Sequence, residues 1–419
     1  MLSGFFPSES EATLPKNRIL VLTADFSTSA DDRWLMDDLV DALVAEGAQV
    51  DVVVFDHKRI RPRGVSIRNG HRVRVISVGP ARLPKGRLDK AWSYLYSAAL
   101  LHTRVYRLVR NENYDLALFT SIGVISAGLP ARIRGSRIAK RLVFLLWDFF
   151  PVHQMEIGRL PKNALTGSLR LLELSTFKNA DHVAVMSPSN ARFFSKYHPE
   201  FSGRTMILPP WAQSPVESYE IDKKLKIFTA IFGGQLVAGR GVETLIDAAH
   251  LLEMRKTKIQ IIVAGEGPLK LALEEKVCAL RLTNVRFLGA LPRPIYRDVL
   301  RSAHVGVAAT VSGVTVPSFP SKIVEYCRAS LPVIACLEDS TDAGELLENS
   351  GAGISVAAND AEELAIALER MEGKHRSGEL VIMARAAGEY FSSSLSDVRA
   401  AQTILASGET STFAQRDAD

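Results

Sequence analysis

The chain has 419 residues, of which 47% are hydrophobic and 23% charged; this composition is ordinary for a globular protein and excludes a disordered chain. A chain of this length is too long for one hydrophobic core and predicts two domains of about 200 residues each. The longest stretch without formal charge, 303–321, contains two prolines and two glycines, which excludes a membrane-spanning helix there. Cys278, Cys327 and Cys336 lie in apolar stretches without metal-ligand spacing, so we expect buried thiols in a reducing, cytoplasmic compartment.

The net charge of +5 is unevenly distributed along the chain. Residues 1–210 hold 29 Lys and Arg against 19 Asp and Glu, whereas the remainder holds 22 against 27. Residues 56–90 alone contain eleven basic and two acidic residues. This asymmetry indicates that the first half faces a polyanion, with nucleic acid and an anionic bilayer as the two candidates.

The first half alternates between β-type and helical patterns. Apolar β-branched runs indicate strands, and apolar residues at helical spacing indicate the segments between them. The predicted elements are a strand at 18–23, a helix at 34–46, a strand at 49–55, a helix near 89–111, and strands at 116–120 and 141–146. Alternation of this kind predicts a parallel sheet with right-handed crossovers.

A second alternating series follows a proline-rich, loop-like junction that begins at Leu208. It predicts strands at 228–232, 259–264, 285–288, 304–309, 332–336 and 353–356, and helices at 241–254, 268–280, 294–302, 322–329, 343–349 and 361–371. The fold class is therefore α/β, with two Rossmann-like, doubly wound domains facing each other across a cleft. We expect an acceptor-binding domain at 17–208, a donor-binding domain at 209–390, and a C-terminal helix or tail at 391–419.

The first glycine-rich turn of the second half ends a strand and begins a helix. Gly233 and Gly234 permit close backbone approach, and Arg240 stands beside the predicted helix start. Free amides at a helix N-terminus together with a guanidinium make a phosphate site. A turn that only connects strand to helix remains the alternative.

The second turn carries Gly265, Glu266 and Gly267, followed by Pro268 at the first helical position. Taken alone, this pattern slightly favours an efficient strand-to-helix connection over a nucleotide site.

The third segment, Val316–Tyr326, is the most informative. A loop stiffened by prolines brings Ser321 and Lys322 to a helix start, where amides and a cation can bind a diphosphate. Glu325 lies one turn further on, and its two oxygens can accept hydrogen bonds from the vicinal hydroxyls of a ribose. The alternative is that Glu325 only complements the helix dipole.

In this order and spacing, the three segments resemble the donor domain of the retaining GT-B glycosyltransferases known as family 4, over about residues 228–371. The run Pro-Ser-Lys-x-x-Glu-Tyr that ends at Tyr326 is similar to the subgroup that builds bacterial capsule, O-antigen and exopolysaccharide units. The resemblance implies that the glycine turns and Arg240 hold the diphosphate and that Glu325 binds the ribose. Two positions depart from the family: Pro317 replaces a glutamate, and Gln235 replaces a basic residue.

The strand end at 145–154 in the first half resembles the family segment His-Asp-x-x-Pro. Asp148 and Pro151 match, whereas Trp147 replaces the histidine. Asp148 could orient an acceptor hydroxyl and His153 could relay its proton. A turn-capping aspartate and a surface histidine are the alternatives.

The resemblance implies a transferase without a tightly bound metal, in which Arg240, Lys322 and helix-start amides neutralise the leaving diphosphate. The implied partners are a UDP-, GDP- or dTDP-sugar donor and a lipid-linked or glycan acceptor. Residues 91–110 have the pattern of an interfacial helix, or of a helix that covers a sheet. The first pattern predicts a cytoplasmic protein peripheral to the inner face of an anionic membrane, and no nucleic-acid motif is present. A non-catalytic nucleotide-sugar-binding subunit, or an enzyme acting on a free nucleotide sugar such as an epimerase, stays open.

Overall fold

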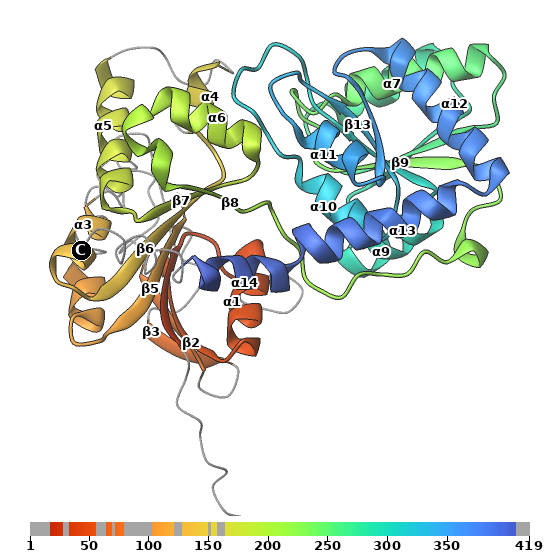
Figure 1. Ribbon diagram of the computed structural model, residues 1–419. Helices are drawn as coiled ribbons and strands as arrows, with labels where there is room; N and C mark the ends of the chain where they lie inside the picture. The colour runs from red at the N-terminus through yellow and green to blue at the C-terminus, as the bar shows by residue number, and fades with distance from the viewer. Residues whose placement is uncertain are drawn as a thin grey trace, which may run out of the picture.

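The computed structural model describes residues 17–27, 33–55, 64–68, 72–78, 103–120, 128–149, 152–156 and 164–407. Two α/β lobes lie side by side, each built on its own sheet (Figure 1). The first half of the chain forms one sheet and the second half forms the other, as the alternating sequence pattern predicts.

Within the described residues, the first sheet has eight strands in the order β3-β4-β2-β1-β5-β6-β7-β8, and β3 is antiparallel to its neighbour. The strands are β1 (Asn17–Thr23), β2 (Ala48–Phe55), β3 (Gly64–Arg68), β4 (Val73–Val78), β5 (Tyr114–Thr120), β6 (Ala139–Leu146), β7 (His182–Val185) and β8 (Thr205–Ile207). The helices are α1 (Leu35–Ala45), a helix over 103–109, α3 (Leu129–Gly135), α4 (Val152–Glu156), α5 (Ala164–Asn179) and α6 (Pro188–Tyr197).

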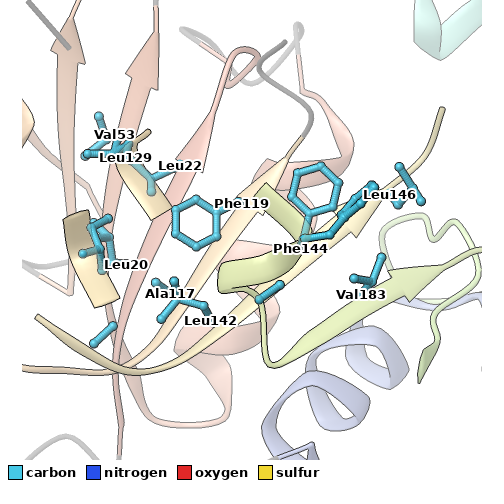
Figure 2. Close-up of a cluster of buried hydrophobic side chains, with 14 of the residues drawn as sticks. Leu20, Leu22, Val53, Ala117, Phe119, Leu129, Leu142, Phe144, Leu146 and Val183 are labelled. Atoms are coloured by element: carbon cyan, nitrogen blue, oxygen red, sulfur yellow. The ribbon is translucent and has the colours of Figure 1, made fainter. Parts of the chain in front are cut away.

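Both faces of this sheet are covered, which explains why β1 is a continuous apolar run. Leu20 and Leu22 pack into one cluster, together with Phe119 and Phe144, as Figure 2 shows. Ile19 and Val21, which alternate with them along β1, pack into a second cluster on the opposite face. A parallel strand that is buried on both faces loses the polar alternation of a half-exposed strand.

The second sheet is parallel throughout its described strands, in the order β11-β10-β9-β12-β13-β14. Its strands are β9 (Thr229–Gly233), β10 (Gln260–Ala264), β11 (Val285–Gly289), β12 (Val305–Ala309), β13 (Val333–Leu337) and β14 (Gly353–Ala357). Its helices are α7 (Val242–Met254), α8 (Lys270–Ala279), α9 (Arg293–Ser302), α10 (Ser321–Arg328), α11 (Ala343–Asn349) and α12 (Ala361–Ser377). This is the doubly wound Rossmann order: the strand order changes direction between β9 and β12, from which successive strands are added toward opposite edges of the sheet, and ligands bind beyond the carboxyl ends of those two strands.

The end of the described chain returns to the first lobe. After α13 (Leu380–Tyr390) and a π-helical turn (Phe391–Leu395), α14 (Asp397–Ala406) packs beside α1 (Figure 1). Ala401 and Ile404 of α14 are fully buried in the first lobe's core. Of the segment 391–419, expected as a helix or tail, the π-helical turn packs in the second lobe, and α14 is an integral part of the first lobe.

Two expectations from composition have different outcomes. Cys327 and Cys336 are buried as expected, but Cys278 is exposed, because it lies on the outer side of α8. Among the described helices, none is both long and apolar enough to cross a bilayer.

Candidate active site

Three loops meet at the carboxyl ends of β9, β10 and β12, where the strand order of the second sheet changes direction. The first begins at Gly233, which is buried and whose amide donates to the hydroxyl of Tyr326 (3.0 Å). A side chain at Gly233 would place Cβ 1.9 Å from the Tyr296 hydroxyl, so only glycine fits at this position. Its neighbour Gly234 lies close to Lys322, since a Cβ there would be 3.6 Å from Lys322 Cε.

Gly265 and Gly267 bring the second loop against the first. A Cβ at Gly265 would lie 1.8 Å from the Gly234 carbonyl oxygen, and one at Gly267 would lie 2.3 Å from that of Leu236. The amides of Gly234 and Leu236 donate across this contact to the carbonyls of Ala264 and Glu266, both at 2.9 Å. The glycines are therefore needed because the backbones of the two loops lie within hydrogen-bonding distance of each other, which leaves no space for side chains.

Lys322 and Glu325 form an ion pair on the first turn of α10. Lys322 Nζ is 2.5 Å from Glu325 Oε2, and both side chains are about one-third exposed, at 31% and 36%. Ser321 is exposed at the start of the same helix. The predicted cation, carboxylate and helix start thus lie together beside the first glycine loop.

Arg240 lies at the far end of that glycine loop and is exposed. Next to it, Gly241 has a φ of +61°, and a Cβ there would come within 2.6 Å of the Thr310 carbonyl oxygen, so the loop passes over the end of β12. Within the described part of the chain, the Arg240 guanidinium has no ion pair. The side chain is therefore available to a ligand at this edge.

Glu266, predicted beside the nucleotide, has a different environment. Its carboxylate forms an ion pair with Lys270 at 2.6 Å, and this hydrogen bond lowers its pKa. The backbone carbonyl of Glu266 makes the contact with the first loop, whereas its exposed side chain pairs with Lys270 at the start of α8.

A buried carboxylate that the sequence pattern did not single out organises the third loop. Glu338, which is 4% exposed, accepts hydrogen bonds from the hydroxyls of Thr310 and Ser318 and from the Ser318 amide (3.3 Å). The Thr341 hydroxyl donates to the carbonyl of Ser318. These bonds fix both ends of the loop between β12 and α10; the glutamate follows β13, far along the chain from that loop.

In the first lobe, the predicted acceptor residues follow β6. Trp147 is edge-on to Trp211, with ring centroids 5.7 Å apart, and packs against hydrophobic clusters of both lobes. Asp148 comes next and is half-buried. His153 lies on the short helix α4, half-buried, with its amide donating to the Phe149 carbonyl (2.9 Å).

Direct contacts join the carboxyl ends of the two sheets. After β7, the Ser189 amide and hydroxyl donate to the buried carboxylate of Asp342, at 2.6 and 2.8 Å. Asn190 Nδ2 donates to the Pro317 carbonyl at 2.8 Å. The carboxyl edges of the two sheets therefore face each other, with Asp148 and Lys322 on opposite sides.

Pro317, which departs from the family pattern, is buried in this contact. The loop around it extends into the first lobe, where Glu156 accepts hydrogen bonds from the Thr315 hydroxyl and from the amides of Thr315 (3.1 Å) and Val316 (3.3 Å). Val316 is buried in the first lobe's core. The loop thus contacts the opposite lobe at the position where the family carries a carboxylate.

The two halves of the chain each match a glycosyltransferase domain family. Residues 228–372 match the family described as glycosyl transferases group 1, and residues 35–211 match the glycosyl transferase 4-like domain. The chain is a GT-B glycosyltransferase.

Similar proteins are remote in sequence from this glycosyltransferase. An uncharacterized glycosyltransferase of Methanocaldococcus jannaschii is 21% identical over 252 residues, which are 55% of this chain and 58% of that relative. The alignment thus spans less than two thirds of that curated relative.

Solved structures resemble the glycosyltransferase over nearly its whole length. Sucrose-phosphate synthase from Thermosynechococcus elongatus superposes with a TM-score of 0.73 at 17% identity, covering 95% of this chain and 100% of that one. Anabaena HepE in complex with UDP-glucose gives 0.63 at 16% identity, covering 94% and 100%. At these identities the likeness establishes the GT-B fold.

Proposed function

We propose that the chain transfers a sugar from a UDP-, GDP- or dTDP-sugar to a lipid-linked or glycan acceptor, with retention of configuration, in bacterial surface polysaccharide synthesis. The observation that carries this proposal is the Lys322–Glu325 pair at the start of α10, beside Gly234, where the second sheet reverses. A cation and free amides suit a diphosphate, and a carboxylate one turn further on suits a ribose. The binding of UDP-glucose by Anabaena HepE, which has the same fold, agrees with a nucleotide-sugar donor.

The donor half would stabilise the leaving group. As the bond from the anomeric carbon to the diphosphate oxygen breaks, negative charge develops on the diphosphate. Lys322, Arg240 and the α10 amides would neutralise it, and electrostatic stabilisation of this kind is usually the largest single catalytic contribution.

The acceptor half would orient the attacking hydroxyl. Asp148 would hold this hydroxyl and His153 would relay its proton. With retention, the acceptor oxygen bonds to the anomeric carbon on the face that the diphosphate leaves, and the proton passes to the departing phosphate oxygen.

The membrane location is proposed from the basic stretch 56–90, most of which lies outside the described residues. Two of its arginines have internal partners: Arg68 pairs with Asp37 at 3.1 Å, and Arg74 pairs with Asp51 and with Glu112. The remaining basic residues, with the segment 91–102 that also lies outside the described part, would meet an anionic leaflet at the inner face of the cell membrane. Co-sedimentation with anionic but not with zwitterionic vesicles tests this location.

Nucleotide binding tests the central claim. In a thermal-shift panel of UDP, GDP, dTDP and CMP, a ligand at a hundred times its dissociation constant adds about 2.7 kcal/mol to the stability of the folded state. We expect one of the three nucleoside diphosphates to produce this shift and Glu325→Ala to abolish it. A panel without any shift contradicts the proposed function.

A non-catalytic nucleotide-sugar-binding subunit is the second candidate, favoured by Pro317 in place of the family's glutamate. In that case the chain would bind the nucleotide without turnover. Transfer by the purified chain alone, from any donor to a lipid-linked acceptor, rules this candidate out.

A further inference from the structure

Tyr296, on α9, lies against the residues proposed to bind the donor. Its hydroxyl occupies the space that a side chain at Gly233 would need. Lys322 Nζ lies 5.1 Å from the centre of its ring, within the range of a cation–π contact. The tyrosine therefore borders both the glycine loop and the Lys322–Glu325 pair.

The Tyr296 hydroxyl is buried, and no described group meets the geometry of a hydrogen bond with it. Tyr326 and Glu325 nevertheless lie close enough to interact with it, and burial first, then these two groups, raise the pKa of Tyr296 far above the ordinary value. The hydroxyl thus stays protonated, and it is stabilised when it donates a hydrogen bond. A buried hydroxyl without a well-formed hydrogen bond is destabilising, so a second state in which it donates one is favoured.

Of these two neighbours, Tyr326 is already engaged. Its hydroxyl accepts from the Gly233 amide (3.0 Å) and donates to the Val307 carbonyl (3.3 Å). Glu325 has its strong bond to Lys322 and two oxygens with several acceptor sites. Glu325 is therefore the natural acceptor for the Tyr296 proton.

We propose that Tyr296 is a positioning residue. When a nucleoside diphosphate draws Lys322 away from Glu325, the Tyr296 hydroxyl replaces Lys322 as the hydrogen-bond donor to Glu325. The inference rests on the proposed function. A diphosphate carries more negative charge than one carboxylate and competes for the ammonium group. Glu325 then loses its donor, and the Tyr296 hydroxyl replaces it, holding one oxygen and leaving the other directed to the ribose hydroxyls.

The exchange predicts two separable contributions to nucleotide affinity. Inorganic pyrophosphate meets Lys322 and the helix start but offers no ribose, so it does not depend on the orientation of Glu325. A nucleoside diphosphate uses both groups. Tyr296→Phe keeps the ring against Gly233 and removes only the hydroxyl.

The experiment is calorimetric titration of the full chain and of Tyr296→Phe with pyrophosphate and with whichever of UDP, GDP and dTDP the wild type binds most tightly. We expect about tenfold weaker binding of the nucleoside diphosphate, the size of one hydrogen bond to a charged group, and unchanged binding of pyrophosphate. Tyr390→Phe, at a half-buried tyrosine on α13, is the matched control and should leave both affinities unchanged.

A double-mutant cycle with Glu325→Gln gives the second readout. In the Glu325→Gln background, Tyr296→Phe should have less than a threefold effect, because the charged acceptor is gone. Equal weakening of both ligands by Tyr296→Phe, or no weakening of either, overturns the inference while the proposed function stands. If the wild type binds none of the nucleoside diphosphates, the proposed function fails and the inference fails with it.

Discussion

Close backbone contacts at single glycines shape the candidate donor site. At Gly233, Gly265 and Gly267 an added Cβ would lie within about 2.3 Å of a neighbouring atom, far inside van der Waals contact. At the last two positions the neighbouring atom is a backbone oxygen that cannot move away alone. These three residues are therefore required by packing, whatever the ligand.

Gly233→Ala tests this packing directly. The new methyl group would collide with the Tyr296 hydroxyl at 1.9 Å, and we expect a loss of about 1–3 kcal/mol of unfolding free energy in urea titrations. Gly373→Ala, in the interior of α12 with nothing near its Cβ, should instead gain about 1 kcal/mol from helix propensity. Equal stability of Gly233→Ala and wild type contradicts the close contact.

Glu325→Ala and Arg240→Ala test the ligand-facing residues. Each should reduce transfer by about a hundredfold or more, because each removes a charge proposed to contact the donor, while the circular dichroism spectrum and melting temperature stay close to wild type. Arg286→Ala, at an exposed arginine on β11, is the matched control for the arginine variant. Normal turnover by either site variant refutes the site assignment.

His304 predicts a pH dependence of stability. It is fully buried, and its Nδ1 accepts from the Thr229 amide at 3.0 Å. Burial first, then His375 and Lys224, lower its pKa to about 4. Between about pH 6.5 and 4 the unfolded chain binds a proton that the folded chain refuses, so stability falls as the pH falls through this range, by at most about 1.4 kcal/mol per pH unit.

The measurement is unfolding free energy against pH for wild type and His304→Asn. The variant should show a smaller fall between pH 6.5 and 4. Parallel curves for the two proteins would show that His304 does not titrate in this way.

Most strands and helices of the second lobe could be predicted from the sequence, because each has an uninterrupted local pattern of apolar residues. The six predicted strands and the six predicted helices match the structure within two residues at each end, except that α12 runs on to Ser377. β8 has only three residues, none of them fully buried, so its pattern is too short to recognise. α14 was predicted only as part of a C-terminal helix or tail at 391–419, without its bounds or its docking, since its apolar face packs on a lobe formed 200 residues earlier in the chain.

The same distinction holds for the candidate site. The glycine turns and the α10 start are local motifs, and the sequence alone pointed to them. Tyr296, Glu338 and Asn190 were missed because their contacts join residues that are far apart in the chain. The only local signal at Tyr296 is an aromatic residue on a predicted helix, which is equally typical of an ordinary core position.

The packing of α14 can be tested at the level of the element. Ile404→Ala should lower the unfolding free energy by about 2–5 kcal/mol, because Ile404 is fully buried against the first lobe. Val398→Ala, on the same helix but 41% exposed, should cost well under 1 kcal/mol. Similar effects at the two positions in urea titrations would contradict the docking of α14 on the first lobe.

At the scale of the whole molecule, buried polar contacts and the apolar packing of Val316 and Trp147 hold the two lobes edge to edge. Asp342→Ala removes the acceptor of both Ser189 bonds, and we expect the lobes to separate, with a larger radius of gyration in small-angle scattering and reduced turnover. Arg192→Ala removes only an exposed partner 3.6 Å from the same carboxylate and should change neither quantity. An unchanged scattering curve for Asp342→Ala would show that other contacts set the arrangement of the lobes.

The return of the last helix to the first lobe also determines the order in which the chain can mature on the ribosome. Domains generally fold as units, from the N-terminal end, during synthesis. Here the nascent first lobe lacks the helix that covers α1 until residue 406 has left the exit tunnel, so an apolar patch stays open while the whole second lobe is translated. We expect the isolated first half, expressed alone, to depend on chaperones that the full-length chain does not need.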